Sequence, residues 1–437
     1  MLSAFAVLLA MQGLALADEK SQGEAEVKAE NWLLHGQSTF IFQGQPGFRA
    51  LYSGENSLPP GDYARETFSV DVFAGARPWD GAEIYGNAEV FQGFGFHNTR
   101  GIAAFPNGEA YKVGNHYGDI IFPHVMLRQT FGLGGGQAKV EGGLMQMAGM
   151  VDVDRVTLTV GRFAVFDQFD VNAYAHDSRG QFMNWALLDT GAFDYAADAF
   201  GYTQGISIEF NQKQWALRWG AFIAPKESNG VELDWNILRQ WQQVVELEWR
   251  YALSGHPGKA RLLGWVERAN MGSYSETLAQ PMLNMDITQT RHFRNQGGAV
   301  LNFEQELRED LGAFLKLGWR DGHSEVWQFT DIDRSLSTGL SLKGKTWGRE
   351  PDTVGLAWNL DGLSPSHRAY LAAGGLGPLV GDGRLNYGLE SVVETYYDAE
   401  LRKGVHLGVD YQFVTNPGYN KDRGPVNIFS VRLHLEF

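Results

Sequence analysis

The chain contains 437 residues, which is enough for two soluble domains or one large all-β unit. Hydrophobic residues make up 44%, aromatic residues 13% and charged residues only 20%, and there are 54 glycines. After the N-terminus no run of about 18 apolar residues occurs, which excludes a bundle of transmembrane helices. The net charge of -15 argues against a nucleic-acid partner, whose phosphates need a basic face, and the absence of cysteine excludes disulfides.

The N-terminal residues have the pattern of an export signal. Leu2–Ala17 is apolar and ends in Ala15-Leu16-Ala17, a small-residue cleavage pattern. No Lys or Arg precedes this apolar run, which departs from the usual signal. The following residues become abruptly hydrophilic. We therefore predict a signal peptide over residues 1–17, a polar N-terminal segment over 18–30 and a mature protein that begins near Asp18.

From Asn31 onward the apolar residues recur with a period of two, the period of a β-strand. Near the C-terminus, Phe429 and Val431 share one face, whereas Arg432 and Glu436 share the other. The pattern predicts about sixteen strands, mostly about ten residues long, a length that crosses a bilayer at a barrel tilt. They lie at 31–43, 66–77, 82–91, 123–131, 154–163, 202–210, 214–222, 243–253, 259–268, 297–306, 311–320, 336–343, 353–361, 391–401, 405–414 and 427–437.

The predicted connections alternate between short turns and long loops. The long ones lie at 44–65, 92–122, 164–201, 223–242, 269–296, 321–335, 362–390 and 415–426. On the short side, 132–153 and 344–352 are too long for tight turns, and the first includes a weak strand-like stretch at 139–147. Short turns at one end and long loops at the other are typical of outer-membrane barrels. We therefore predict that residues 31–437 form one all-β domain, a single transmembrane antiparallel β-barrel with long external loops.

Alternation alone does not say which face of a strand is inside, but the aromatic residues favour one assignment. Trp and Tyr at both rims are typical of a surface that meets two membrane interfaces. The apolar face carries such aromatic residues: Trp215, Trp219, Trp249, Tyr251, Trp319, Trp358, Tyr397, Tyr411 and Phe437. This favours an apolar face toward lipid and a polar face toward the lumen.

The segment 163–200 breaks the strand pattern, because it has neither a strand nor a helix period. A long irregular segment in a compact domain is usually functional or disordered, and this one is too aromatic for disorder. It forms the third of the eight long connections. We predict that it narrows the tube that the strands build.

Motifs along the whole mature chain resemble the OprB-like carbohydrate-selective porins. They are HGQST (35–39), YSGENSL (52–58), FPNGEAY (105–111), LRQTFGL (127–133), NAYAHD (172–177), FMNW (182–185), DYQF (410–413), NP (416–417), YN (419–420) and DRGPV (422–426). Arg162 departs from the family pattern, which often has Lys there. The terminal Phe437 resembles the assembly signal of outer-membrane proteins.

The resemblance implies a sixteen-stranded barrel in the bacterial outer membrane that passes mono- or small oligosaccharides by diffusion. The third external loop would fold into the lumen as a constriction. Neutral sugars and outer-membrane lipid are the expected partners of a monomer or trimer, with no cofactor, metal or nucleic acid. The alternatives are a general porin and a barrel that exports or binds an acidic polysaccharide. The latter would need an excess of lumen arginines, which the acidic balance does not favour.

Sugars carry hydroxyl groups on rings with apolar faces, so a sugar-selective constriction needs aromatic plates together with charged or amide groups. The central segment supplies both kinds of side chain. The predicted solute contacts are Asp167, Asp170, Asn172, Tyr174, His176, Asp177, Arg179, Asn184 and Trp185. The alternative for Asp167, Asn172 and Asp177 is that they close turns by capping backbone amides.

Charged residues on the polar strand face are predicted to line the lumen. They are Arg128, Arg218, Arg250, Arg320, Arg432, Glu246, Glu248, Glu394 and Glu436. Basic and acidic ladders on opposite walls would set a transverse field that filters ions. The alternative is a solvated wall on which the charges matter little.

Enzyme motifs are missing from the sequence. Residues 134–139 lack the final Gly-Lys-Ser/Thr of a P-loop, no Gly-x-Ser-x-Gly elbow occurs, and the 11 histidines form no HExxH pair. Asp331 and Asp333 could bind calcium, but such pairs are more often solvated carboxylates. Ser364 followed by Pro365 predicts a short capped helix in a surface loop.

Overall fold

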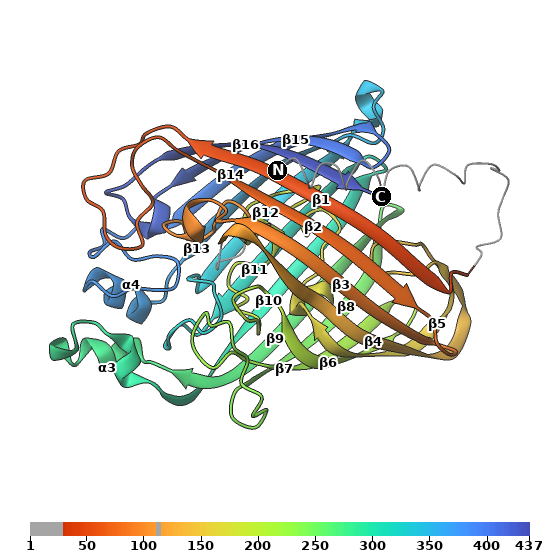
Figure 1. The fold of residues 1–437 in the computed structure, drawn as a ribbon, viewed down its shortest axis with the longest axis horizontal. Coiled ribbons are helices and arrows are strands. Elements are labelled where there is room, and N and C mark those ends of the chain that lie inside the picture. The colour runs from red at the N-terminus through yellow and green to blue at the C-terminus, as the bar shows by residue number, and fades with distance from the viewer. Residues whose placement is uncertain (1–28, 111–114) are drawn as a thin grey trace.

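The computed structural model describes residues 29–110 and 115–437. In this part of the chain, sixteen strands form one closed antiparallel barrel (Figure 1). Each strand pairs with its sequence neighbours, and β1 (Trp32–Gln45) closes the barrel by pairing with β16 (Val426–Glu436). The predicted fold class is confirmed. The predicted signal peptide and residues 18–28 of the polar segment lie outside the described residues.

All sixteen predicted strands are present, with bounds that differ from the predicted ones by a few residues in most cases. The strands between β1 and β16 are β2 (Tyr63–Ala76), β3 (Ala82–Gly93), β4 (Asn115–Val140), β5 (Gly149–Phe163), β6 (Thr203–Asn211), β7 (Trp215–Ile223), β8 (Trp241–Leu253), β9 (His256–Met271), β10 (His292–Arg308), β11 (Leu311–Arg320), β12 (Arg334–Lys343), β13 (Thr353–Gly362), β14 (Glu390–Arg402) and β15 (Val405–Thr415).

The weak strand-like stretch at 139–147 does not form a strand of its own. Lys139 and Val140 end β4, and most of the remaining stretch is a turn in which Gly143 bridges to Gln146. β4 and β5 pair directly with each other, so the residues between them form the turn of a hairpin and have no neighbouring strand of their own.

The outward face of the barrel is the apolar one. On β16, Phe429 and Val431 are 56% and 46% exposed, whereas the alternate residues Ser430, Arg432 and His434 are buried. The same alternation recurs on β14, where Glu390, Glu394 and Asp398 point inward and are buried. Large apolar side chains exposed on strand after strand would be costly in water, and they fit a lipid-facing surface.

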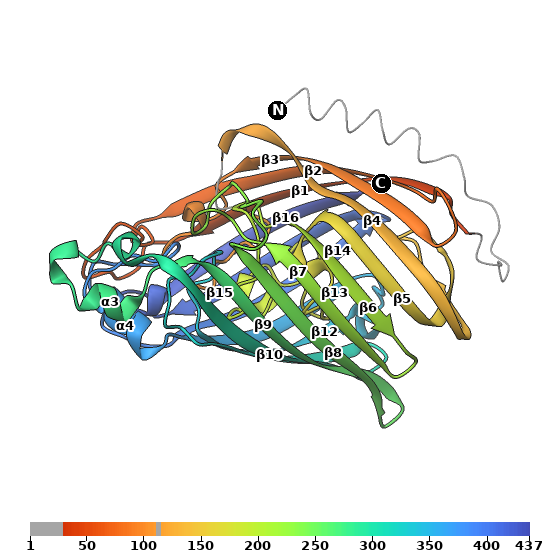
Figure 2. The same cartoon turned by 90° about the horizontal axis from the view of Figure 1, so that it is seen from below.

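The connections divide into short turns at one end and long loops at the other. The long loops are L1 (46–62), L2 (described over 94–110), L3 (164–202), L4 (224–240), L5 (272–291), L6 (321–333), L7 (363–389) and L8 (416–425). Figures 1 and 2 both place α3 (Tyr274–Leu278) of L5 and α4 (Pro365–Ala372) of L7 at the loop end. Another short helix, α2 (Trp185–Leu188), lies in L3. Among the described residues, no helix is long and apolar enough to cross a membrane.

Single turns of 3-10 helix occur in the loops and turns as well. They are η2 (His97–Thr99), η3 (Val165–Asp167), η4 (Pro281–Leu283), η5 (Ile287–Thr290), η6 (Gly344–Trp347) and η7 (Pro417–Tyr419). The predicted cap of α4 is confirmed, because Ser364 Oγ accepts a hydrogen bond from His367 N at 3.2 Å. The expected position in a surface loop is also confirmed, since α4 lies in L7 with Pro365, Arg368 and Ala369 exposed, whereas Ser364 and His367 face inward and are buried.

The inner wall is less polar than the alternation suggested where L3 packs against it. Phe222 (β7) and Trp265 (β9) point inward and are buried. Phe169 of L3 lies edge-on to Phe222 with ring centres 6.0 Å apart, and Phe193 lies 6.3 Å from Trp265. A loop folded inside a barrel needs a hydrophobic core of its own, and these side chains from the wall supply part of it.

Candidate functional site

L3 crosses the lumen and is held by carboxylates from widely separated strands. Glu246 (β8) accepts a hydrogen bond from Asp170 N at 2.7 Å. Glu304 (β10) accepts one from Ala173 N at 2.9 Å. Glu394 (β14) accepts hydrogen bonds from the backbone N–H groups at 183 and 184, at 2.5 and 2.9 Å. The barrel wall thus satisfies backbone donors in the parts of L3 that lie outside its two short helices, α2 and η3, and that have no internal partner.

Cations from the wall satisfy the carbonyl groups of L3. Lys316 Nζ (β11) donates to the carbonyl oxygens of Ala175, Leu187 and Leu188 at 2.9, 3.1 and 3.1 Å. Arg432 donates to those of Ser178 and Gln181. Sequence reasoning did not single out Lys316, although its inward parity on β11, shared with Arg320, was a usable signal. The third loop therefore folds into the lumen, as predicted, and is hydrogen-bonded to the wall on several sides.

Four of the predicted contact residues are shielded from solvent. Asp170 and Asn184 are 0% exposed, Asn172 is 2% and Trp185 is 5%. Asp170 Oδ1 accepts from Asn302 Nδ2 at 2.7 Å, and Asn172 Nδ2 donates to Asn302 Oδ1 at 2.7 Å. The expected solute contact therefore needs correction for Asp170, Asn172 and Asn184, whose side chains hold L3 in place because the tight lumen leaves them no open surface.

Asn184 and Trp185 belong to the packing of α2. The Asn184 side chain accepts from Ala186 N at 3.1 Å and donates to Ala104 O of L2 at 2.8 Å. The Trp185 ring stacks on Phe105 of L2 with centres 5.1 Å apart and meets Phe329 of L6 edge-on. One edge of Trp185 still borders the cavity on the loop side of L3.

Cavities lie on both sides of L3. The loop-side cavity, about 240 Å³, is bordered by aromatic residues of three loops, among them Phe105, Phe166 and Phe329. Two turn-side cavities have volumes of about 330 and 700 Å³. Asp177 borders the loop-side cavity and the smaller turn-side one, and Asp167 borders the loop-side cavity and the larger one. These two carboxylates therefore lie where solution on the two sides of L3 comes closest.

The remaining predicted contacts cluster around these carboxylates. Tyr174 borders the smaller turn-side cavity, and His176 and Arg179 border the loop-side one. Arg179 Nη2 lies 3.0 Å from Glu109 Oε1 of L2 and 3.5 Å from Asp71 Oδ2 of β2, so it ties L3 to the opposite wall. Burial lowers the pKa of His176 to about 4, so its ring is neutral at neutral pH.

Asp167 has a turn-closing role beside its lumen position. Its Oδ2 accepts from Ala164 N at 3.0 Å and lies 2.9 Å from Nε2 of His124, which is on β4. Asp177 Oδ1 likewise accepts from Arg179 N at 2.9 Å. Both carboxylates cap backbone amides and border the cavities, so the two alternatives predicted for them are not exclusive.

The charged wall residues do not form ladders on opposite walls. Arg218 Nη1 lies 2.6 Å from Glu246 Oε1, and Arg250 Nε lies 2.8 Å from Glu248 Oε1, so these four residues pair on the same wall of β7 and β8. Side chains on adjacent strands lie within contact distance, so opposite charges there form ion pairs with each other rather than face each other across the lumen.

The other predicted wall residues also have partners. Arg128 Nη1 lies 3.5 Å from Glu83 Oε2, Arg432 Nη2 lies 3.2 Å from Asp398 Oδ1, and Glu436 Oε1 lies 3.1 Å from His434 Nε2. Glu436 borders the smaller turn-side cavity, and Arg128 borders the larger one. The inner wall is thus charged but extensively ion-paired, and a transverse field across the lumen is not evident from these pairs.

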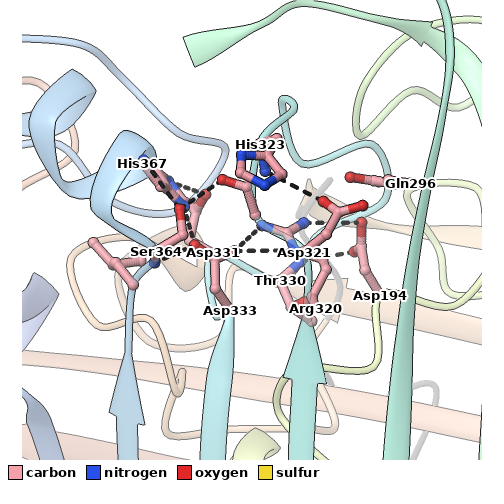
Figure 3. Close-up of polar contacts among 12 residues, drawn as sticks. Asp194, Gln296, Arg320, Asp321, His323, Thr330, Asp331, Asp333, Ser364 and His367 are labelled. Atoms are coloured by element: carbon pink, nitrogen blue, oxygen red, sulfur yellow. Dashed lines mark hydrogen bonds and ion pairs between the residues drawn. The ribbon is translucent and has the colours of Figure 1, made fainter. Parts of the chain in front are cut away.

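Arg320 joins a buried cluster at the loop end (Figure 3). Its guanidinium pairs with Asp333 of L6 and lies 3.7 Å from Asp194 of L3. Asp333 also contacts Nδ1 of His367 in α4 at 3.1 Å, and Asp331 accepts from the backbone N–H of Leu379 at 2.7 Å. The expectation that Asp331 and Asp333 are solvated carboxylates was wrong, because both are 0% exposed.

This cluster ties L3, L6 and L7 together over the lumen. Asp194 accepts four hydrogen bonds from consecutive backbone N–H groups of L6, those of residues 327–330. His367 stacks on Tyr274 of L5 with ring centres 4.4 Å apart. We define Asp194, Arg320, Asp331, Asp333 and His367 as the loop clamp.

The loop clamp predicts a pH dependence of loop docking. Burial raises the pKa of the Asp331 carboxyl from 3.8 to about 6, although His367 and two backbone amides oppose the shift. The docked loops bind this proton more tightly than the undocked loops do. Protonated Asp331 therefore contributes about 3 kcal/mol to the free energy of loop docking below about pH 4, and this contribution is lost as the pH rises through about 6. The measurement is the hydrogen-exchange protection of the Leu379 and Val380 amides, corrected for intrinsic exchange.

Two variants identify the titrating group in that experiment. Asp331→Asn is expected to remove the fall in protection. His367→Gln is expected to retain the fall and to move it to higher pH, because His367 lowers the pKa of Asp331. An equal pH dependence in the wild-type chain and in Asp331→Asn would show that another group is responsible.

Among the residues at 29–110 and 115–437, no group of three or more His, Cys, Asp or Glu side chains could hold a metal ion.

A closed sixteen-stranded barrel with an apolar outer surface, a charged inner wall and a loop folded across its lumen is the architecture of a porin. The sequence model of the OprB family, the carbohydrate-selective porins, matches residues 55–437. The chain therefore belongs to the OprB family and is a carbohydrate porin.

Solved structures agree on the fold. The OprB of Pseudomonas putida is similar with a TM-score of 0.70 and 14% sequence identity, over 93% of this chain and 94% of that one. The outer-membrane channel DcaP of Acinetobacter baumannii is similar with a TM-score of 0.51 and 10% identity, over 93% and 97% of the two chains. At these identities the likeness concerns the fold alone. No curated protein matches the sequence significantly.

Proposed function

We propose that neutral mono- or small oligosaccharides diffuse through this barrel past Asp167 and Asp177. The observation that carries the proposal is that each carboxylate borders a cavity on both sides of L3. On the loop side, the aromatic edges of Phe166, Trp185 and Tyr195 offer apolar surface for the C–H face of a sugar ring. Carboxylates beside them accept hydrogen bonds from sugar hydroxyls.

The membrane placement is the second part of the proposal. The exposed apolar side chains of the strands fit the lipid of a bacterial outer membrane, with the loops outside and the turns in the periplasm. Each chain encloses its own lumen, so a monomer and a trimer would both provide complete channels. The acidic balance of the chain gives no support to the export of an acidic polysaccharide.

Liposome swelling tests the proposed sugar selectivity. Liposomes containing the full chain should swell faster in glucose than in a neutral solute of the same size and different shape. Asp177→Ala is expected to reduce this preference by up to roughly tenfold, because it removes a charged hydrogen-bond acceptor. Asp286→Asn is the matched control, since this exposed L5 carboxylate caps only its own turn. Equal swelling rates of the wild-type chain in the two solutes would leave a general porin.

A further inference from the structure

We infer that the outward face at the loop end of β8, β9 and β10 binds the phosphate group of an anionic membrane lipid. The site consists of Arg239 (L4), Arg268 (β9) and Phe293 (β10). The guanidinium carbons of Arg239 and Arg268 lie 5.0 and 5.5 Å from the centre of the Phe293 ring, so one ring orients two cations. The inference rests on the proposed membrane placement and concerns the outer surface, not the channel.

The strand register places this site at the edge of the apolar band. On β9 the outward residues Leu262 and Val266 are 54% and 39% exposed, and Arg268 is the next charged outward position. Arg268 pairs across the sheet with Trp241, the first residue of β8. Amphipathic aromatic residues and arginines at the edge of an apolar band lie at the depth of lipid headgroups.

The two guanidinium groups keep an uncompensated charge. In the described part of the chain, neither has a carboxylate oxygen within 4.0 Å. Two exposed carboxylates of the neighbouring loops are already paired, Glu232 with Lys226 at 2.6 Å and Glu276 with Arg294 at 3.1 Å. A concentrated positive site on a chain with a net charge of -15 calls for an anionic ligand.

Apolar side chains beside the arginines identify a lipid as the source of that anion. Trp235, Ile237 and Leu238 of L4 are 70%, 61% and 83% exposed and immediately precede Arg239 in the chain. Such side chains can enter the boundary between headgroups and acyl chains, while guanidinium groups bind phosphate oxygens in a bidentate manner. A soluble phosphate would use the arginines but leave this apolar surface in water.

Native mass spectrometry of the full chain in detergent tests the site. The probes are dioleoyl phosphatidylglycerol and dioleoyl phosphatidylcholine, which share acyl chains and differ in net charge. The wild-type chain should retain phosphatidylglycerol preferentially, and the double variant Arg239→Gln/Arg268→Gln should bind it roughly tenfold more weakly. Arg384→Gln is the matched control, because that guanidinium also stacks on a ring, Tyr52 at 3.8 Å, but lies in L7 away from the strands. It should bind as the wild-type chain does.

Three results would overturn the inference: equal retention of the two lipids by the wild-type chain, unchanged phosphatidylglycerol binding by the double variant, or a dimer that the double variant abolishes. The last would assign the face to contact between copies of the chain. Glucose swelling of the double variant should equal that of the wild-type chain, which shows that it has folded. Failure of the wild-type chain to select glucose would contradict the proposed function without changing the lipid result.

Discussion

Lys316→Met is expected to release L3 from the barrel wall. The substitution removes the donor to the carbonyl groups of Ala175, Leu187 and Leu188, and it removes a positive charge that acts on the buried Asp170. Leaving a buried carbonyl group without its donor typically costs about 1–3 kcal/mol, and this substitution affects three such groups. Single-channel conductance in planar bilayers should therefore rise, and the preference for glucose over a larger disaccharide in liposome swelling should shrink.

Lys343→Met provides the matched control for this experiment. Lys343 borders the smaller turn-side cavity, and its ammonium group donates to the Thr353 hydroxyl at 3.1 Å rather than to L3. It should leave the preference for glucose over the disaccharide unchanged. If Lys316→Met kept both the conductance and the preference of the wild-type chain, the packing of L3 against Phe222 and Trp265 would be sufficient to hold the constriction, and the anchoring role of Lys316 would be refuted.

The second large effect is expected at the loop clamp. Asp333→Asn removes the carboxylate that pairs with Arg320 and contacts His367, and it leaves a fully buried guanidinium whose remaining carboxylate partner among the described residues is the more distant Asp194. We expect the docking of L6 and L7 to lose about 3–5 kcal/mol. Limited proteolysis should then cut L7 much faster than in the wild-type chain, while the barrel strands stay protected.

Glu309→Gln is the control for a surface pair. Glu309, in the turn between β10 and β11, pairs with Lys345 at 2.9 Å, and the two side chains are 77% and 60% exposed. Exposed ion pairs contribute about 0–1 kcal/mol, so this variant should be cut at the wild-type rate. Unchanged cleavage of L7 in Asp333→Asn would mean that the loops are held by apolar packing and that the buried charges only fix their orientation.

The strands could be predicted because their determinants are local. A period of two places alternate side chains on opposite faces of a strand, whatever the rest of the chain does. The positions of Phe429 and Arg432 on opposite faces of β16 therefore follow from the local sequence. The third long connection was recognisable for a related reason, since 163–200 lacks both periods and is rich in aromatic residues.

The roles inside the lumen were not predictable in the same way. Parity placed Glu246, Glu394 and Arg432 on the inner wall, but it could not show that they bind the backbone of L3 rather than face open solvent. Asp170 and Asn184 carry groups suited to a sugar, yet they are buried as loop anchors. Composition describes what a side chain can bind, and only the neighbours that surround it decide what it does bind.

The sequence by itself therefore determined the barrel, the orientation of its faces and the segment that narrows it. Strand alternation and chain order suffice for the barrel and the segment, and the aromatic residues on the apolar face orient the wall. Only the tertiary structure decided that Lys316 holds L3, that Arg320 and Asp333 belong to a clamp over the lumen, and that Asp167 and Asp177 border both sides of the constriction. These contacts join residues far apart in the chain across an enclosed space. Their partners are set by barrel closure and loop packing, for which a single sequence contains no local periodicity.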